Sequence, residues 1–212
     1  TVVPALVVIP LSQRLIPDPA EDDLQGWLKA AVGTGNYPFA QEVLGRMIER
    51  EPLNVRNHFL NVYVLFRIAE RDSREEAVQK MYASWSGCGD PNRSDIGHFG
   101  LGCFALSRGD CAGALAELDL VGNRRLHYLH TLRGRALAGS GRLPEAAESF
   151  RTEIDYGGDL GGAVRELSFL LYETADRQGL AEICGRADLR RWIPCYILRW
   201  ASLRPLRGGI YL

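Results

Sequence analysis

The sequence lacks several features that would assign it to a common functional class. It has almost no net charge, with 25 basic residues against 26 acidic ones, so no overall field attracts nucleic acid. Its five cysteines form no C-x-x-C pair, and their odd number fits neither a zinc knuckle nor a complete disulfide framework. We therefore expect no nucleic-acid partner, no metal site and no cofactor. We also expect the cysteines to be reduced and packed, which indicates a cytoplasmic location for the protein.

The sequence also lacks an uninterrupted apolar run of about 18 residues, the length needed to cross a bilayer. Its apolar start is broken by Pro4 and Pro10. From Arg186 onward, six arginines stand against a single acid and are interspersed with aromatic and aliphatic residues. Such a composition suits a membrane surface and a covering cap of the fold equally well.

We expect three regions on this basis. They are an apolar, membrane-proximal lead-in over residues 1–20, a helical domain over residues 21–188, and a basic aromatic C-terminal segment over residues 189–212. The chain begins at Thr1 rather than at methionine, so we interpret it as part of a longer or processed protein. As a hypothesis, the parent protein has transmembrane helices outside this sequence, which would place the domain at the cytoplasmic face of a membrane.

Four short turn-like triplets divide the sequence into similar units. They begin at Gly35, Asp72, Gly109 and Gly141, and an alanine follows five residues after each start. An apolar residue comes four positions after that alanine, and therefore on the same face of a helix. These paired positions are Ala40 and Leu44, Ala77 and Met81, Ala114 and Leu118, and Ala146 and Phe150. Each triplet thus predicts a tight turn that opens an amphipathic second helix.

A first helix precedes each of these turns. Small or apolar residues recur seven and four positions before the turn, so one stripe of this helix is kept small or apolar; they are Leu28 and Ala31, Leu65 and Ile68, Gly102 and Ala105, and Gly134 and Leu137. Small side chains allow two antiparallel helices joined by a tight turn to cross closely. The pattern therefore predicts an all-α chain of helix pairs.

Residues 132–150 resemble a tetratricopeptide repeat (TPR). The signature places of that family are occupied by Gly134, Leu137, Gly141, Ala146 and Phe150. Residues 98–121 resemble it nearly as well, and the resemblance extends well over residues 21–155 and poorly over residues 160–188. It implies a right-handed α-solenoid of four to five TPR-like helix-turn-helix repeats, the last one degenerate or capping.

The second unit, over about residues 55–85, departs from this pattern. It has no glycine at its turn. The alanine spacings along the chain are 37, 37 and 32 residues, whereas this family repeats at about 34. We expect the helices of the second unit to be longer or differently tilted.

Two histidines and the cysteines are the candidates for chemistry. His127 and His130 stand at i and i+3, a spacing that can place two imidazoles on one side of a helix. However, His98 and His130 both lie eleven residues before a turn glycine, where this family packs a bulky side chain, so we favour packing. No G-x-S-x-G motif is present, and Cys103 and Cys111 lie inside the repeat pattern. We therefore expect no catalytic residues.

The resemblance also implies a binding surface. In this family, the first helices of successive units line a concave groove, and three places of each helix face it. The residues that occupy these places here are Lys29, Phe59, Phe99, Tyr128 and Arg135. Arg56 and Tyr63 are added because they share the helical face of Phe59. Aromatic and arginine side chains are good anchors for a peptide, although burial in the core is the alternative for Phe59 and Phe99.

The expected function is a non-enzymatic scaffold that binds a protein or peptide partner in this groove. The resemblance suggests a membrane-associated bacterial assembly, such as polysaccharide secretion or envelope biogenesis. One alternative is self-association, in which the groove takes residues 192–212 of the same chain or of a neighbouring copy in a homo-oligomer. Another is a regulatory appendage of a membrane enzyme that binds a small ligand or metal through His127, His130 or the cysteines. In both cases the C-terminal segment remains a candidate contact for a membrane surface.

Overall fold

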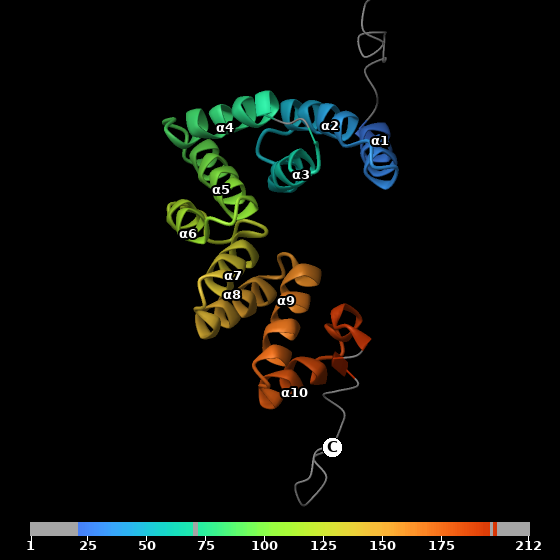
Figure 1. Cartoon of the computed structure of the whole chain (residues 1–212), viewed down its shortest axis with the longest axis vertical. Helices are drawn as coiled ribbons and strands as arrows, with labels where there is room; N and C mark the ends of the chain where they lie inside the picture. The colour runs from blue at the N-terminus through green and yellow to red at the C-terminus, as the bar shows by residue number, and fades with distance from the viewer. Residues whose placement is uncertain (1–20, 70–71, 196, 199–212) are drawn as a thin grey trace, which may run out of the picture.

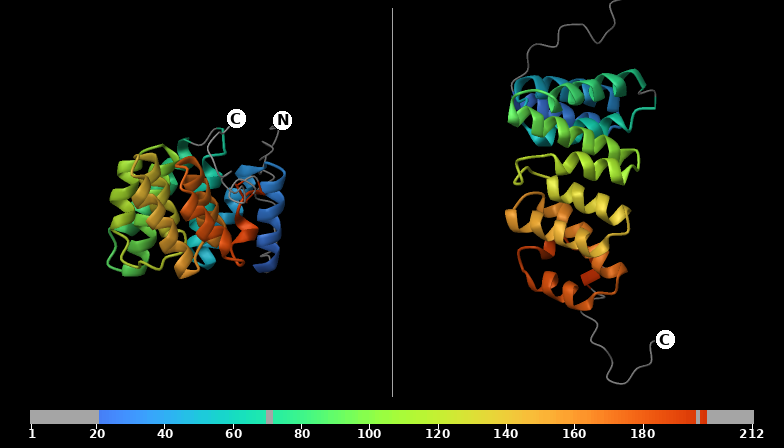
Figure 2. Two further views of the ribbon diagram at one scale, coloured as in Figure 1. Left: turned by 90° about the horizontal axis from the view of Figure 1, so that it is seen from below. Right: turned by 90° about the vertical axis from the view of Figure 1, so that its left-hand side faces the viewer.

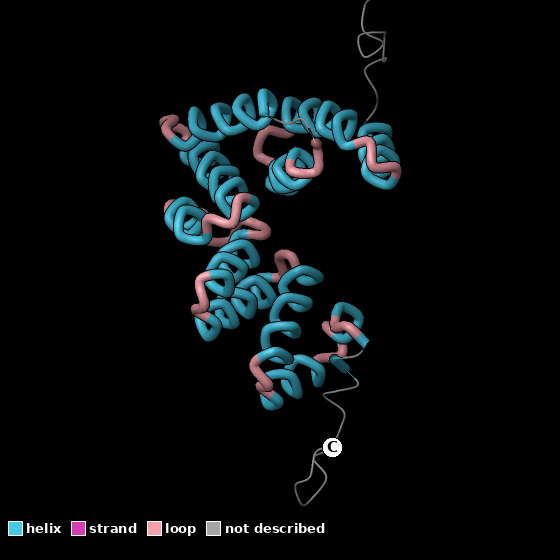
Figure 3. The backbone as a smooth tube through the Cα atoms, viewed as in Figure 1, coloured by secondary structure: helices cyan, strands magenta, loops and turns pink. Residues whose placement is uncertain are grey.

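The computed structural model describes residues 21–69, 72–195 and 197–198, and across these residues it has helices and no β-strand (Figure 3). The predicted all-α class is therefore confirmed for the described chain. The helices are α1 (Glu21–Gly33), α2 (Tyr37–Arg50), α3 (Val55–Leu65), α4 (Asp72–Ser86), α5 (Pro91–Ser107), α6 (Cys111–Asp119), α7 (Leu129–Gly139), α8 (Leu143–Tyr156), α9 (Leu160–Glu173), α10 (Arg177–Gly185) and a short 3-10 helix, Arg190–Trp192. The lead-in expected over residues 1–20 lies outside the described residues.

The helices follow one another along the long axis of the molecule, with α1 and α2 at one end and α9 and α10 at the other (Figures 1 and 2). Antiparallel neighbours pack as pairs: α1 with α2, α5 with α6, α7 with α8, and α9 with α10. In addition, α3 contacts α5, α5 contacts α7, and α7 contacts α9. α3 and α6 lie on opposite sides of α5 (Figure 1). The odd-numbered helices from α3 onward therefore form a continuous row along one side of the molecule.

The three predicted glycine turns are confirmed. Gly35, Gly109 and Gly141 have φ angles of +73°, +81° and +77°, in the left-handed region that glycine adopts without a steric penalty. The N–H of the residue after each glycine donates to a carbonyl oxygen in the last turn of the preceding helix, at 2.8 to 2.9 Å. This is the hydrogen bond of a Schellman helix end, which satisfies a carbonyl group that the helix itself leaves free.

Close helix crossings explain the predicted alanine and glycine positions in three of the units. Ala40, Ala114 and Ala146 are completely buried at the start of α2, α6 and α8. A Cβ atom added to Gly102 would lie 2.7 Å from the side chain of Leu118, and one added to Gly134 would overlap the ring of Phe150. The glycine of the first helix thus leaves room for the bulky residue of the second.

The register predicted for α4 is wrong. Ala77, expected to be packed, is exposed, and Tyr82 rather than its neighbour Met81 is the fully buried residue. α4 packs extensively on α5, whereas it contacts α3 mainly through side chains, with the rings of Tyr82 and Trp85 against His58. A Cβ atom at Gly100 would overlap the Tyr82 ring, so α5 provides the close approach. Because no turn glycine holds α4 against α3, the glycine-bearing face of α5 determines which side of α4 is buried.

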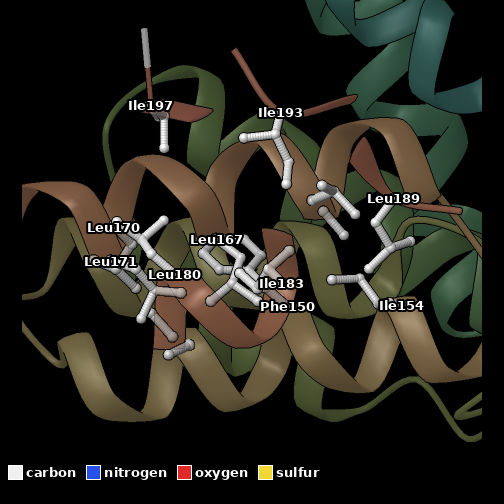
Figure 4. Packing of buried hydrophobic residues seen from close by; sticks show 14 of the residues in the cluster. Phe150, Ile154, Leu167, Leu170, Leu171, Leu180, Ile183, Leu189, Ile193 and Ile197 are labelled. Atoms are coloured by element: carbon white, nitrogen blue, oxygen red, sulfur yellow. The ribbon is translucent and has the colours of Figure 1, made fainter. Parts of the chain in front are cut away.

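The described part of the C-terminal segment belongs to the core of the last helices. Leu189, Ile193 and Ile197 are buried in one cluster with residues of α8, α9 and α10, among them Phe150 and Leu167 (Figure 4). This part of the segment therefore covers the end of the helical stack, and the expected boundary at residue 188 does not coincide with the edge of the core. Within the described ranges, none of the helices is both long and apolar enough to cross a membrane.

A buried histidine links α3 to α4 and should make stability sensitive to acid. The ring of His58 is fully buried, with Nδ1 3.1 Å from the Tyr82 hydroxyl and Nε2 2.9 Å from the carbonyl oxygen of Pro52. Burial lowers the pKa of His58 from its usual 6.5, and the hydrogen bond to Pro52 partly offsets this. Because the lower pKa belongs to the folded state, the unfolded chain binds more protons as pH falls through about 6.5.

We therefore expect the urea midpoint to fall as pH is lowered from about 7.5 to about 5.5, where ordinary carboxylates remain ionised. The measurement is urea unfolding followed by circular dichroism at several pH values. A His58→Gln variant, although less stable, should show a flatter pH dependence over this range. Equal slopes for the two proteins would assign the acid sensitivity to other groups.

Candidate functional site

Two adjacent pockets lie along the row of odd-numbered helices. The α1–α3 pocket has a volume of about 460 Å³, and Lys29 and Arg56 are among its lining residues. The α3–α7 pocket has a volume of about 320 Å³; it is lined by α3, α5 and α7, with Phe59 and Arg135 among its residues. Tyr63 lines both pockets, so they adjoin one another. We call the two pockets together the inner groove.

The inner groove brings together most of the residues predicted for the binding surface. Lys29, Arg56 and Tyr63 line the α1–α3 pocket, and Tyr63 also lines the α3–α7 pocket with Phe59 and Arg135. Tyr128 contacts the same surface through Phe59, since the two rings stack with centroids 4.8 Å apart and planes inclined by 12°. Residues that are distant in the sequence, on α1, α3 and α7, therefore share one face.

Phe99 is a correction to the predicted surface. Its side chain is completely buried, in the cluster against which Phe59 and Tyr128 pack. α5 is in contact with α3, α4, α6 and α7, so little of its surface remains free. From α5, the groove is instead lined by Cys103, Leu106 and Ser107 near the end of the helix. The alternative of burial thus holds for Phe99, while Phe59 is only partly buried.

The stack of Phe59 on Tyr128 joins α3 directly to the start of α7. Offset or parallel aromatic pairs of this kind contribute about 0.5–1.5 kcal/mol beyond the area they bury. Burial is the main cause that raises the pKa of Tyr128, and the nearby carboxylates of Asp159 and Glu153 add to it, so the phenol stays neutral near pH 7. The stack therefore fixes the spacing of two groove helices at one end of the groove.

A buried carboxylate holds Tyr128 in place. Tyr128 has a φ of +68°, which is uncommon for a residue with a side chain. Glu153 of α8 is 2% exposed; its Oε1 accepts the N–H of Tyr128 at 3.0 Å and that of Asp159 at 2.9 Å. Its Oε2 accepts the N–H groups of His130 at 2.9 Å and Thr131 at 3.3 Å. Glu153 thus caps the N-terminus of α7 from α8, and it also holds Asp159, the residue that precedes α9.

The sequence contained no signal for this role of Glu153. A glutamate within an amphipathic helix is usually a solvated surface residue. In the structure, Gly158 leaves space for this carboxylate, because a Cβ atom at Gly158 would overlap Oε1 of Glu153. The contact joins residues of α7 and α8 through hydrogen bonds from side chain to backbone, and such bonds leave no periodic pattern in the sequence.

The cations of the inner groove differ in their partners. Arg135 makes two hydrogen bonds to Oε1 of Glu166 on α9, from Nε at 3.0 Å and from Nη2 at 2.8 Å, so its charge is largely compensated within the fold. Among the described residues, neither Lys29 nor Arg56 forms an ion pair or a hydrogen bond through its side chain. These two cations are therefore the ones available to a bound molecule.

The histidines considered as metal ligands have protein partners. His130 is buried, and its Nε2 lies 2.8 Å from the carbonyl oxygen of Arg124. His98 pairs through Nδ1 with Oε2 of Glu117 at 2.9 Å. The ring of His127 packs edge-on against Tyr128, with centroids 4.1 Å apart. Within the part of the chain that the structure describes, no three potential metal ligands come together.

No family model matches this chain. A search of curated proteins finds no matching sequence either. The resemblance to the tetratricopeptide repeat therefore rests on the residues at its signature places.

Proposed function

We propose that this chain is a TPR-like α-solenoid that binds a protein or peptide partner in the inner groove and has no catalytic activity of its own. The observation that carries the proposal is the gathering of Lys29, Arg56, Phe59, Tyr63 and Arg135 from three helices around two adjoining pockets. Lys29, Phe59 and Arg135 were selected from the repeat register, and Arg56 and Tyr63 because they share the helical face of Phe59. A random set of exposed positions would not be expected to converge on one face of the fold.

The chemistry of the groove supports binding rather than catalysis. Each pocket combines aliphatic side chains with a few polar groups, a mixture typical of peptide and ligand sites. Cys103, the one thiol among the described lining residues, is 4% exposed, and burial raises its pKa, so it remains a protonated and poor nucleophile near pH 7. A partner seated here would be held by apolar burial together with contacts to Lys29 and Arg56.

Self-association through the chain's own C-terminal segment is the weaker alternative. That segment contributes arginines at positions 199, 204 and 207, which would approach the cations Lys29 and Arg56 in the groove. Like charges at close range oppose binding. A membrane-associated bacterial assembly remains part of the proposal only through the resemblance, and the identity of the partner determines whether it is correct.

A site-specific photo-crosslink tests the proposed function. A benzophenone amino acid is placed at position 63 of the full chain, the protein is irradiated in lysate of the source organism, and the adducts are identified by mass spectrometry. Tyr63 is 42% exposed and lines both pockets, so a partner in the groove should be captured there. We expect one or a few proteins or peptides to be strongly enriched.

The matched control places the same group at position 156. Tyr156 is 50% exposed, comparable with Tyr63, but it lies at the end of α8 and lines neither groove pocket. The partner should be captured several-fold less from this position. Equal capture from both positions, or capture from position 156 alone, would place binding outside the inner groove and contradict the proposal.

A further inference from the structure

The inner groove is lined by charge of one sign. Lys29 and Arg56 line the α1–α3 pocket and Arg135 lines the α3–α7 pocket, and among the residues that the structure describes no aspartate or glutamate lines either one. The chain as a whole has slightly more acidic than basic residues, so composition alone does not produce this bias. Another pocket, between α6, α7 and α8, is lined by Asp119, Glu145 and Glu148 together with two arginines. The groove is therefore a locally cationic surface.

The positive charge is concentrated at one end of the groove. Arg135 already pairs with Glu166, whereas Lys29 and Arg56 are exposed and lack such a partner among the described residues. Both belong to the α1–α3 pocket. A carboxylate in that pocket would complete two charge-assisted contacts, which are roughly twice as strong as neutral hydrogen bonds.

A buried amide in the same pocket also lacks a partner. Asn57 lines the α1–α3 pocket and is 2% exposed, and within the described structure its Nδ2 has no hydrogen-bond acceptor. An unsatisfied buried donor costs about 1–3 kcal/mol, so such groups are rare in folded proteins. A small movement of this side chain on binding would let Nδ2 donate to a carbonyl or carboxylate oxygen of a ligand. The amide adds an acceptor requirement to the charge requirement set by Lys29 and Arg56.

The other end of the groove is apolar. The α3–α7 pocket is lined by Phe59, Val62, Leu106 and Leu132, and the paired Arg135 is the only cation among its described lining residues. An aliphatic or aromatic side chain could be buried in this pocket without leaving a buried charge unpaired. Because Tyr63 lines both pockets, a carboxylate in one and an apolar side chain in the other would come from residues close together in an extended chain.

We propose that the inner groove binds an extended acidic peptide segment. An aspartate or glutamate of the peptide pairs with Lys29 and Arg56 in the α1–α3 pocket, and an apolar side chain a few residues away enters the α3–α7 pocket. The proposal rests on the proposed function and specifies the chemistry of its partner. We assign the carboxylate to a side chain, and the experiment below distinguishes it from a C-terminal carboxylate.

Affinity selection from a synthetic peptide mixture tests this proposal. The probes are random peptides of about 12 residues, long enough to cross both pockets at ~3.3 Å per residue, in one library with amidated C-termini and one with free C-termini. The full chain is immobilised, and retained peptides are sequenced by mass spectrometry. We expect retained peptides from both libraries to be enriched in aspartate or glutamate near an aliphatic or aromatic residue, and depleted in lysine and arginine.

Charge reversal provides the specificity test. A Lys29→Glu, Arg56→Glu double variant should retain the acidic peptides about tenfold less or weaker still and should enrich lysine- and arginine-containing peptides instead. The control double variant, Lys80→Glu with Arg125→Glu, has the same change in net charge at exposed positions outside the inner groove. Its selection should match that of the native chain. Circular dichroism of each variant establishes that its helices are intact.

The possible failures are distinguishable. If neither library yields retained peptides, this inference is overturned, whereas the proposed function, which includes a folded protein partner, is decided by the photo-crosslink at position 63. If peptides are retained without an excess of acidic residues, peptide binding stands and the acidic specificity is overturned. If the excess appears only at free C-termini, the carboxylate is terminal and the side-chain assignment is overturned. These outcomes are read from the native chain alone, so they hold even if a variant does not fold.

Discussion

Replacing Glu153 with glutamine is expected to destabilise the chain by about 3–4 kcal/mol, although the two side chains have nearly the same shape. The carboxylate accepts four backbone N–H groups, two at each oxygen. In glutamine, one oxygen becomes an NH₂ group that faces two donors. Those backbone groups would lose their acceptor in a site that is 2% exposed.

The measurement is the free energy of unfolding from urea titrations followed by circular dichroism. Glu148→Gln is the matched control, since Glu148 is an exposed residue on the same helix and its replacement should change stability by no more than about 0.5 kcal/mol. A similar loss of stability in both variants would mean that the negative charge on α8, rather than the cap of α7, stabilises the fold. A negligible loss for Glu153→Gln would contradict the capping role.

Loss of this cap should also disturb the stack of Tyr128 on Phe59 beside the inner groove. Glu153 accepts the N–H of Tyr128, which has a left-handed backbone conformation, and the Tyr128 ring stacks on Phe59. When the backbone at Tyr128 is released, the stack loses the support that orients it. Glu153 is therefore a positioning residue for the groove, although it lines neither groove pocket.

Truncating Tyr82 to alanine is expected to cost about 3–5 kcal/mol, the range for removing a fully buried aromatic side chain. The Tyr82 ring is completely buried between α4 and α5, where it packs edge-on against Phe104 with centroids 6.1 Å apart. Its hydroxyl is also 3.1 Å from Nδ1 of His58, so truncation leaves a buried ring nitrogen without its partner. Urea unfolding again provides the measurement.

The informative comparison is with the neighbouring residue Met81. Met81 is only partly buried, so Met81→Ala should cost about 1 kcal/mol. The repeat register assigns the packed position to Met81, whereas the structure assigns it to Tyr82. If Met81→Ala proves the more damaging change, α4 has the register of the sequence pattern and its packing on α5 is wrong.

Local regularities explain why much of the fold could be predicted. The turns at residues 35, 109 and 141 require a left-handed backbone conformation, which glycine adopts readily and few other residues tolerate. The alanines that follow them are buried where two helices joined by a short turn cross closely, and such a crossing requires small side chains. Both constraints act within one helix pair and therefore recur at nearly constant spacing.

The second unit shows where this reasoning fails. Its turn has no glycine, so the position of α4 relative to α3 is not constrained locally. Gly97 and Gly100 on α5 decide the packing instead, since added Cβ atoms there would overlap the backbone at Ser86 and the ring of Tyr82. α5 is itself packed against α3, α4, α6 and α7, and Phe99 is correspondingly in the core rather than in the groove.

The sequence by itself determined the all-α class, the helix pairs with their glycine turns, and most of the residues that line the inner groove, because these follow from periodic spacing within single units. Only the tertiary structure decided which face of α4 is buried, that Glu153 caps α7, and that Arg135 is paired with Glu166 while Lys29 and Arg56 remain available. Each of these depends on contacts between different helices, where hydrogen-bond satisfaction and close packing select partners that no repeat spacing encodes.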